Sequence, residues 1–270
     1  MSVQTVARKD LADAGRSSAL WAVAALAVLF TGGVSTLAVV FADVSAQQML
    51  QLISQLAAFI FPILALMAAK GAITQERESG SLRTLLSLPP SRGDVLLGKF
   101  LGRSTLVLFA TFAGTLVTGV VVGVALGVSE IGLVAALAVF LALMAVAFVS
   151  VGVGVSAAAS TDGRATAFAV GYYILTVVLL SLIVRAITFL AAELGLIATG
   201  AESLPGWIQF LRMAVPNEAA IAAYRAVAAG HSLFGSAPLQ SVWLPTLVLF
   251  AWIVLPVAGG LVRFRRADLG

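Results

Sequence analysis

Few residues of this sequence have the types and spacing that chemistry needs. The chain has one histidine, His231, and no cysteine, which excludes thiolate sites and disfavours a catalytic triad or a histidine-rich metal site. Residues 93–99 read Gly-Asp-Val-Leu-Leu-Gly-Lys, the first part of a phosphate-binding loop. Phe100 then stands where serine or threonine must bind magnesium, and no strand precedes the pattern. We therefore expect no catalysis and no nucleotide binding by this chain.

The composition indicates a membrane protein. Hydrophobic residues make up 61% of the chain and charged residues only 10%, against about 25% charged in a soluble domain. The apolar residues form long runs, which are typical of membrane-spanning helices, and short alternating segments of a barrel are missing. A basic face with aromatics is also missing, so we expect the lipid bilayer as a partner and no nucleic acid. The prediction is an all-α polytopic membrane protein.

We predict one transmembrane domain, 1–270, with six spanning helices of at least the ~20 residues that a ~30 Å hydrocarbon layer requires. The predicted spans are 18–41, 49–72, 95–126, 131–159, 165–190 and 242–262. Between them we predict an interfacial helix at 2–16, a polar coupling segment at 74–94 and an outer region at 191–241. Of the 16 Lys and Arg residues, only Arg185, Arg212 and Arg225 then lie outside, so both termini are predicted to be cytoplasmic.

The interfacial helix and the outer region carry weaker signals. Val3, Val6, Ala7, Leu11 and Ala14 fall on one side of 2–16, which predicts an amphipathic helix in the membrane interface; a frayed tail is the alternative. In the outer region, an alanine-rich stretch starts near residue 217 and ends near residue 230. An N-cap asparagine and a C′ glycine at these positions predict a short helix of about three turns, on or dipping into the outer face.

The coupling segment has clear helix boundaries. Gly80 suits the left-handed conformation that ends a helix, and Ser81 can cap a new one. Pro89 and Pro90 end that short helix. Ser91 and Asp94 form a capping-box-like pattern at the start of the next span.

The short helix between Ser81 and Pro89 is amphipathic. Leu82, Leu85 and Leu86 lie on one face and must be covered. The residues alone are compatible with two surfaces that could bury these leucines. One is the bilayer or the protein's own helices, and the other is a groove on a soluble partner.

Residues 76–99 read Glu-x-x-x-Gly-Ser-Leu-x-x-Leu-Leu-Ser-x-Pro-x-Ser-Arg-x-x-x-x-x-Gly-Lys. This pattern closely resembles that of ABC-type exporter permeases, and more narrowly the permeases of the nitrous-oxide reductase maturation transporter and its relatives. Residues 7–11 and 264–269 resemble the same family's start and end. The inner-loop pattern is the specific part of the resemblance.

The resemblance implies a transmembrane permease subunit that exports its substrate by alternating access. It implies a coupling helix at residues 76–89 that sits on a cytoplasmic ABC ATPase subunit, present in two copies, on which ATP and magnesium bind. A chain with six spans then implies a second permease copy, in the plasma membrane of a prokaryote. The implied ATPase contacts are Glu76, Glu78, Gly80, Ser81, Leu82, Arg83, Leu85, Leu86, Arg92, Asp162 and Arg164.

Two other functions compete with this one. A secondary transporter or channel half would need charged or interrupted helices at mid-membrane, and a membrane anchor would need only the inner loop. For Lys70, Arg103 and Arg185, near the ends of apolar segments, we expect snorkelling rather than substrate contact. A glycine stripe at 119, 123 and 127 predicts close helix packing.

Overall fold

The computed structural model describes residues 2–42, 45–80, 91–195, 205–234, 239 and 241–266, which form helices and connecting turns without a strand. In chain order the helices are α1 (Val3–Gly15), α2 (Ser18–Phe41), α3 (Ala46–Ala69), α4 (Thr74–Glu78), α6 (Arg92–Ala125), α7 (Ile131–Ala158), α8 (Asp162–Tyr173), α9 (Leu180–Glu193), α10 (Gly206–Met213), α11 (Pro216–Ala228) and α12 (Trp243–Arg266). A 3-10 turn, η1 (Val128–Glu130), precedes α7, and a π-helical segment, η2 (Ile174–Leu179), joins α8 to α9.

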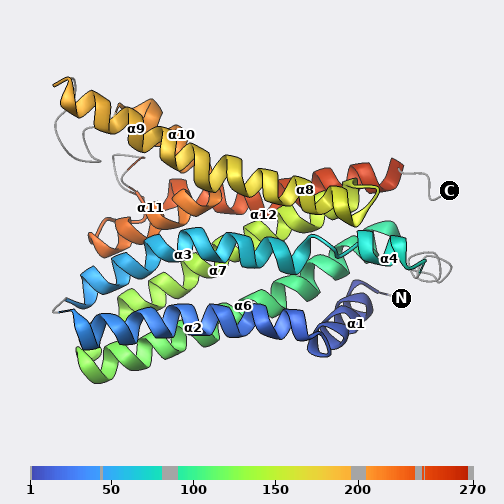
Figure 1. Cartoon of the computed structure of the whole chain (residues 1–270), viewed down its shortest axis with the longest axis horizontal. Coiled ribbons are helices and arrows are strands. Elements are labelled where there is room, and N and C mark those ends of the chain that lie inside the picture. The colour runs from blue at the N-terminus through green and yellow to red at the C-terminus, as the bar shows by residue number, and fades with distance from the viewer. Residues whose placement is uncertain are drawn as a thin grey trace.

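The all-α membrane fold is confirmed. Six helical stretches of the described residues are long and apolar enough to cross a membrane: Trp21–Phe41, Ala46–Glu78, Arg92–Ala125, Val128–Ala158, Asp162–Glu193 and Trp243–Arg266. The start of α1 and the end of α12 lie at the same end of the bundle as α4, which we call the α4 end (Figure 1). That this end faces the cytoplasm stays a prediction from the Lys and Arg distribution.

Helix α7 forms the centre of the bundle, packed against α3, α6, α11 and α12. Its side chains Met144 and Phe148 are fully buried. The α7 backbone closely approaches α12, since a Cβ on Gly154 would lie 2.4 Å from the carbonyl oxygen of Pro256. Small residues allow such approaches where helices have no hydrophobic drive to associate.

The predicted glycine stripe is not where α6 packs most closely. A Cβ on Gly123 would meet no atom within 4 Å, and one on Gly119 would make only ordinary contact. The tight positions are earlier in α6, where a Cβ on Gly98 or Gly102 would come within 2.6 Å of a side chain of α1. The fifth predicted span lies within the continuous helical stretch Asp162–Glu193, of which the π-helical η2 forms a part.

Helix α1 is present, and that its apolar side lies in a membrane interface stays a prediction. It packs along α6, and its buried residues are Val6, Asp10 and Ala14, whereas Leu11 is exposed. The apolar spacing was correctly recognised, yet the helix turns an acid rather than a leucine toward its neighbour. The reason is a set of cations on α6, described below.

The outer region contains two helices that meet at an inner turn. The N-cap of α11 is Val215, with Pro216 in the first turn, so the prediction of Asn217 as N-cap is wrong. Proline suits the first helical turn, where its missing N–H is not needed. The end of α11 follows the prediction: Gly230 has φ +72°, and the N–H of His231 donates to the Ala226 carbonyl over 2.9 Å.

Candidate coupling site at the α4 end

A turn joins α3 to α4, and one hydroxyl of α7 holds it. Ser156 Oγ accepts hydrogen bonds from the N–H groups of Ile73 (3.0 Å) and Thr74 (3.1 Å). Both N–H groups are at a helix start, where no preceding turn can accept them. Ser156 is fully buried, so α7 satisfies these donors and fixes the direction in which α4 leaves the bundle.

The start of α8 is tied to the same turn. Asp162 accepts from Thr74 Oγ1 over 2.9 Å and pairs with Lys70 Nζ over 2.9 Å. Glu78 Oε1 accepts a 2.7 Å hydrogen bond from the Asp162 N–H, which places a carboxylate at the positive end of α8. Arg77 Nη1 donates to the Ala159 carbonyl. Lys70 therefore does not snorkel as predicted, because it has an anionic partner within the chain.

Four buried or half-buried charges join α1, α4 and α6. Lys99 Nζ lies 2.8 Å from Asp10 Oδ1 and 2.7 Å from Glu76 Oε1. Arg103 Nε lies 3.0 Å from Asp10 Oδ2, and its Nη1 donates to the Ala68 carbonyl over 2.9 Å. The side chain of Asp10 is 1% exposed and that of Lys99 is 6% exposed. We call these four residues the α1–α4–α6 ion cluster; it contains two charges of each sign and is neutral.

The start of α6 is held in two ways. Ser91 and Asp94 form the predicted capping box, with Ser91 Oγ accepting from the Asp94 N–H over 3.1 Å and Asp94 Oδ2 accepting from the Ser91 N–H over 2.9 Å. Arg92 Nη1 donates to the Phe264 carbonyl over 2.7 Å, and its guanidinium carbon lies 5.7 Å from the Phe264 ring centroid. This arginine fastens α6 to the end of α12.

The predicted ATPase contacts fall into three groups. Glu76 belongs to the α1–α4–α6 ion cluster, Glu78 accepts from the Asp162 N–H at the start of α8, and Arg92 contacts α12. Gly80 has the predicted left-handed backbone, with φ +74°, and Arg164 is exposed, with Nη1 2.9 Å from Ser160 Oγ. The remaining contacts, Ser81, Leu82, Arg83, Leu85 and Leu86, lie outside the described residues. Their role as ATPase contacts stays a prediction.

Sequence reasoning missed Asp10 and Lys99 as members of this site. A signal was present at Asp10, because an acid stood four residues from Val6 and four from Ala14 on the apolar side of a short helix. Since unpaired buried charges are costly, an acid at such a position indicates a cation on the neighbouring helix. The arrangement provides no nucleophile, acid or base aimed at a cavity. It provides a stiff joint on both sides of residues 81–90.

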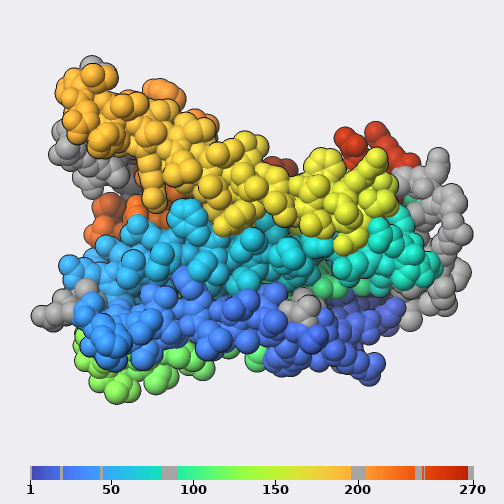
Figure 2. All heavy atoms as spheres, viewed as in Figure 1, coloured from blue at the N-terminus to red at the C-terminus, as the bar shows by residue number. Residues whose placement is uncertain are grey.

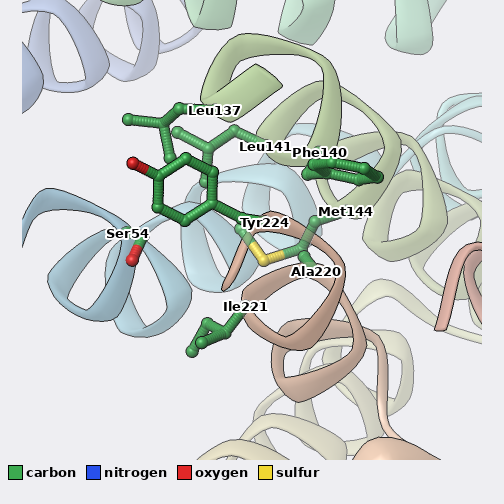
Figure 3. Close-up of a pocket in the computed structure, with 8 residues that line it drawn as sticks. All are labelled: Ser54, Leu137, Phe140, Leu141, Met144, Ala220, Ile221 and Tyr224. Carbon is green, nitrogen blue, oxygen red and sulfur yellow. The ribbon is translucent and has the colours of Figure 1, made fainter. Parts of the chain in front are cut away.

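An apolar groove of about 620 Å³ lies along α7, between this helix and α12. It is lined by α7, α12, Tyr172 of α8, and Phe210 and Ala214 of the outer region. A much smaller cavity, about 10 Å³, lies between α3, α7 and α11, where Tyr224 and Ile221 of α11 face Leu137 and Ser54 (Figure 3). It has room for about one water molecule, so α11 is packed into the bundle.

Comparison with known proteins assigns the family. The model of the family described as "ABC-2 family transporter protein" matches residues 4–269. The chain belongs to this family. ABC-2 membership makes it a transmembrane component of an ABC transporter, as the inner-loop pattern predicted.

Two curated ABC-2 relatives carry the name "Probable ABC transporter permease protein NosY". The protein from Pseudomonas aeruginosa is 38% identical over 116 residues, and that from Stutzerimonas stutzeri is 35% identical over 118 residues. Each alignment covers 42% of this chain and 42% of the relative. The similarity thus spans less than half of either protein.

Proposed function

We propose that this ABC-2 protein is the permease subunit of an exporter, driven by a separate ATPase subunit that binds at residues 81–90. The observation that carries the proposal is the anchoring of both ends of that segment. On one side, α4 is joined to α7, α8, α1 and α6 by Ser156, Asp162 and Lys99. On the other side, the capping box and Arg92 join the start of α6 to α12.

A displacement applied at residues 81–90 would then reach most of the bundle. The connection between α4 and the bundle is stiff because its charges are buried and mutually paired. Breaking these ion pairs during the transport cycle would cost several kcal/mol. The helices therefore move as a body rather than bending at the joint. ATP binding to the partner changes the inward–outward equilibrium by its differential affinity for the two states.

The remaining parts of the proposal come from the resemblance. ATP and magnesium bind the partner ATPase, and this chain is not itself an enzyme. Two permease copies, each with an ATPase, form the path for the substrate in the plasma membrane of a prokaryote. The apolar groove along α7 and α12 supplies a surface for a lipophilic cargo or for the second copy.

The test is a pull-down of the detergent-solubilised chain from its host. The variant Leu85→Asp with Leu86→Asp places two charges on the predicted coupling face. The control, Leu233→Asp with Phe234→Asp, makes the same change at two exposed residues of the outer region, which are 63% and 83% exposed. We expect an ATPase to be recovered with the wild type and the control, and to be lost with the first variant. Recovery with all three, or with none while the protein stays folded, contradicts the proposal.

A further inference from the structure

Helices α10 and α11 dip into the bundle and return. At their inner turn, Trp252 Nε1 donates to the Ala214 carbonyl over 2.8 Å, and Trp252 lies about 14 Å along α12 from its first residue, Trp243, at 1.5 Å per residue. At the other end of α11, Gln47 Nε2 donates to the Ala228 carbonyl over 3.5 Å, at the start of α3. The N-terminus of α11 therefore lies well inside the ~30 Å hydrocarbon layer.

Four charged residues lie on the helices that surround this turn: Arg212 and Glu218 beside it, Arg225 in the last turn of α11, and the exposed Arg185 on α9. Arg212 of α10 pairs through Nε with Glu218 of α11. The guanidinium carbon of Arg185, on α9, lies 6.0 Å from the ring centroid of Phe59 in the middle of α3. Arg212, Glu218 and Arg185 all act electrostatically on Arg225. Three cations and one anion give this group, which we call the inner-turn arginine cluster, two excess positive charges.

The excess charge has no partner among the residues that the structure describes. Arg185 and Arg225 make no hydrogen bond or ion pair there, although Arg225 is half-buried. Arg185 does not reach the edge of the layer either, since Phe59 lies about 20 Å along α3 from its first residue. The snorkelling predicted for it therefore does not account for its position.

Cations at membrane depth are costly and mark functional sites. Helix α9 contacts mainly η2 and α10, and it lies along one edge of the molecule (Figure 2). Arg185 on this helix is exposed, so a ligand can reach it from outside the bundle. The charge, the depth and the access all favour an anionic ligand.

We propose that Arg185, Arg212 and Arg225 bind an oxyanion of the phosphate type. Guanidinium groups present paired N–H donors that match two oxygens of such an anion. Glu218 holds Arg212 while the site is empty and competes with the ligand for it. The phosphate belongs either to the headgroup of an anionic phospholipid or to a free solute. Binding needs no ATPase, so this inference stands or fails apart from the proposed function.

The experiment measures the unfolding temperature of the purified chain in a neutral detergent at constant ionic strength. The probes are inorganic phosphate, phosphatidylglycerol in mixed micelles, and phosphatidylcholine, whose quaternary amine offsets its phosphate charge. We expect phosphatidylglycerol or inorganic phosphate to raise the unfolding temperature, and phosphatidylcholine to have little effect. A response to phosphatidylglycerol alone identifies the headgroup, and a response to inorganic phosphate identifies a free solute.

Three variants connect the response to the cluster. Arg185→Gln with Arg225→Gln should weaken the apparent affinity at least tenfold, while Arg8→Gln, an exposed arginine of α1, should leave it unchanged. Glu218→Gln should tighten binding, because it frees Arg212 and raises the excess charge; a folding defect cannot produce this gain. The proposal is overturned if neither probe stabilises the wild type, or if the cluster variants respond like Arg8→Gln.

Discussion

The two charged regions of this protein differ in whether their positive and negative charges balance. At the α4 end, Asp10 and Glu76 meet Lys99 and Arg103 within ordinary ion-pair distances, and the charges cancel. At the inner turn of α10 and α11, one carboxylate pairs with Arg212, and two further arginines lie near without an ion pair, so the charges of the described residues do not cancel. A neutral, paired cluster binds helices to one another. An unbalanced one leaves free energy that a ligand of opposite charge can release.

This difference assigns separate tasks to the two regions. In the proposed function, the α1–α4–α6 ion cluster transmits force, because its charges pair with one another and resist separation. We propose that the inner-turn arginine cluster recognises a ligand, because its excess charge has no partner among the described residues. The comparison predicts that removing one charge destabilises the first region strongly and the second hardly at all.

The largest effect is expected for Asp10→Asn. The substitution leaves Lys99 and Arg103 without their shared carboxylate in a buried site, and breaking a buried pair in this way costs about 3–5 kcal/mol. The loss of stability is measured as the decrease in the free energy of unfolding in mixed detergent micelles. Asp13→Asn is the matched control on the same helix, since Asp13 is exposed and surface substitutions change stability by about 0.5 kcal/mol or less. Equal effects of the two substitutions would mean that the cluster is not a structural joint.

Ser156→Ala should have an intermediate effect. It removes the acceptor of the Ile73 and Thr74 N–H groups, and an orphaned buried donor costs about 1–3 kcal/mol. Ser104→Ala serves as control, because the buried Ser104 hydroxyl has no hydrogen-bond partner among the described residues. The same unfolding assay applies. If Ser104→Ala lowers the free energy of unfolding as much as Ser156→Ala, the hydrogen bonds at the α3–α4 turn have no special role in stability.

The sequence predicted those features whose signals are local. The capping box of Ser91 and Asp94 and the left-handed Gly80 and Gly230 depend on residues a few positions apart. The prediction of the six spans depends on runs of apolar residues, which are read directly from the sequence. Such features need no knowledge of which helices are neighbours.

The ion clusters could not be predicted, because their members are distant in sequence. Asp10 and Lys99 are 89 positions apart, and only the packing of α1 along α6 makes them partners. Lys70 and Arg103 were expected to snorkel for the same reason, since their acceptors on α8 and α1 are invisible in their own segments. The depth of α11 likewise depends on the Trp252 bond to the Ala214 carbonyl.

The smallest effect is expected for Arg225→Gln, and it sharpens the comparison most. Arg225 is half-buried beside the like charge of Arg212, so its charged form is held in the folded state at a cost. Removing that charge should change the free energy of unfolding by less than about 1 kcal/mol, toward greater stability. Arg103→Gln is the matched substitution at the α4 end and should destabilise, because Asp10 and the Ala68 carbonyl lose their donor. Both are measured without added phosphate or anionic lipid, since an occupied site would reverse the sign at residue 225. If Arg225→Gln destabilises as strongly as Arg103→Gln under these conditions, the arginine is a structural group, and the two regions do not differ in the way proposed.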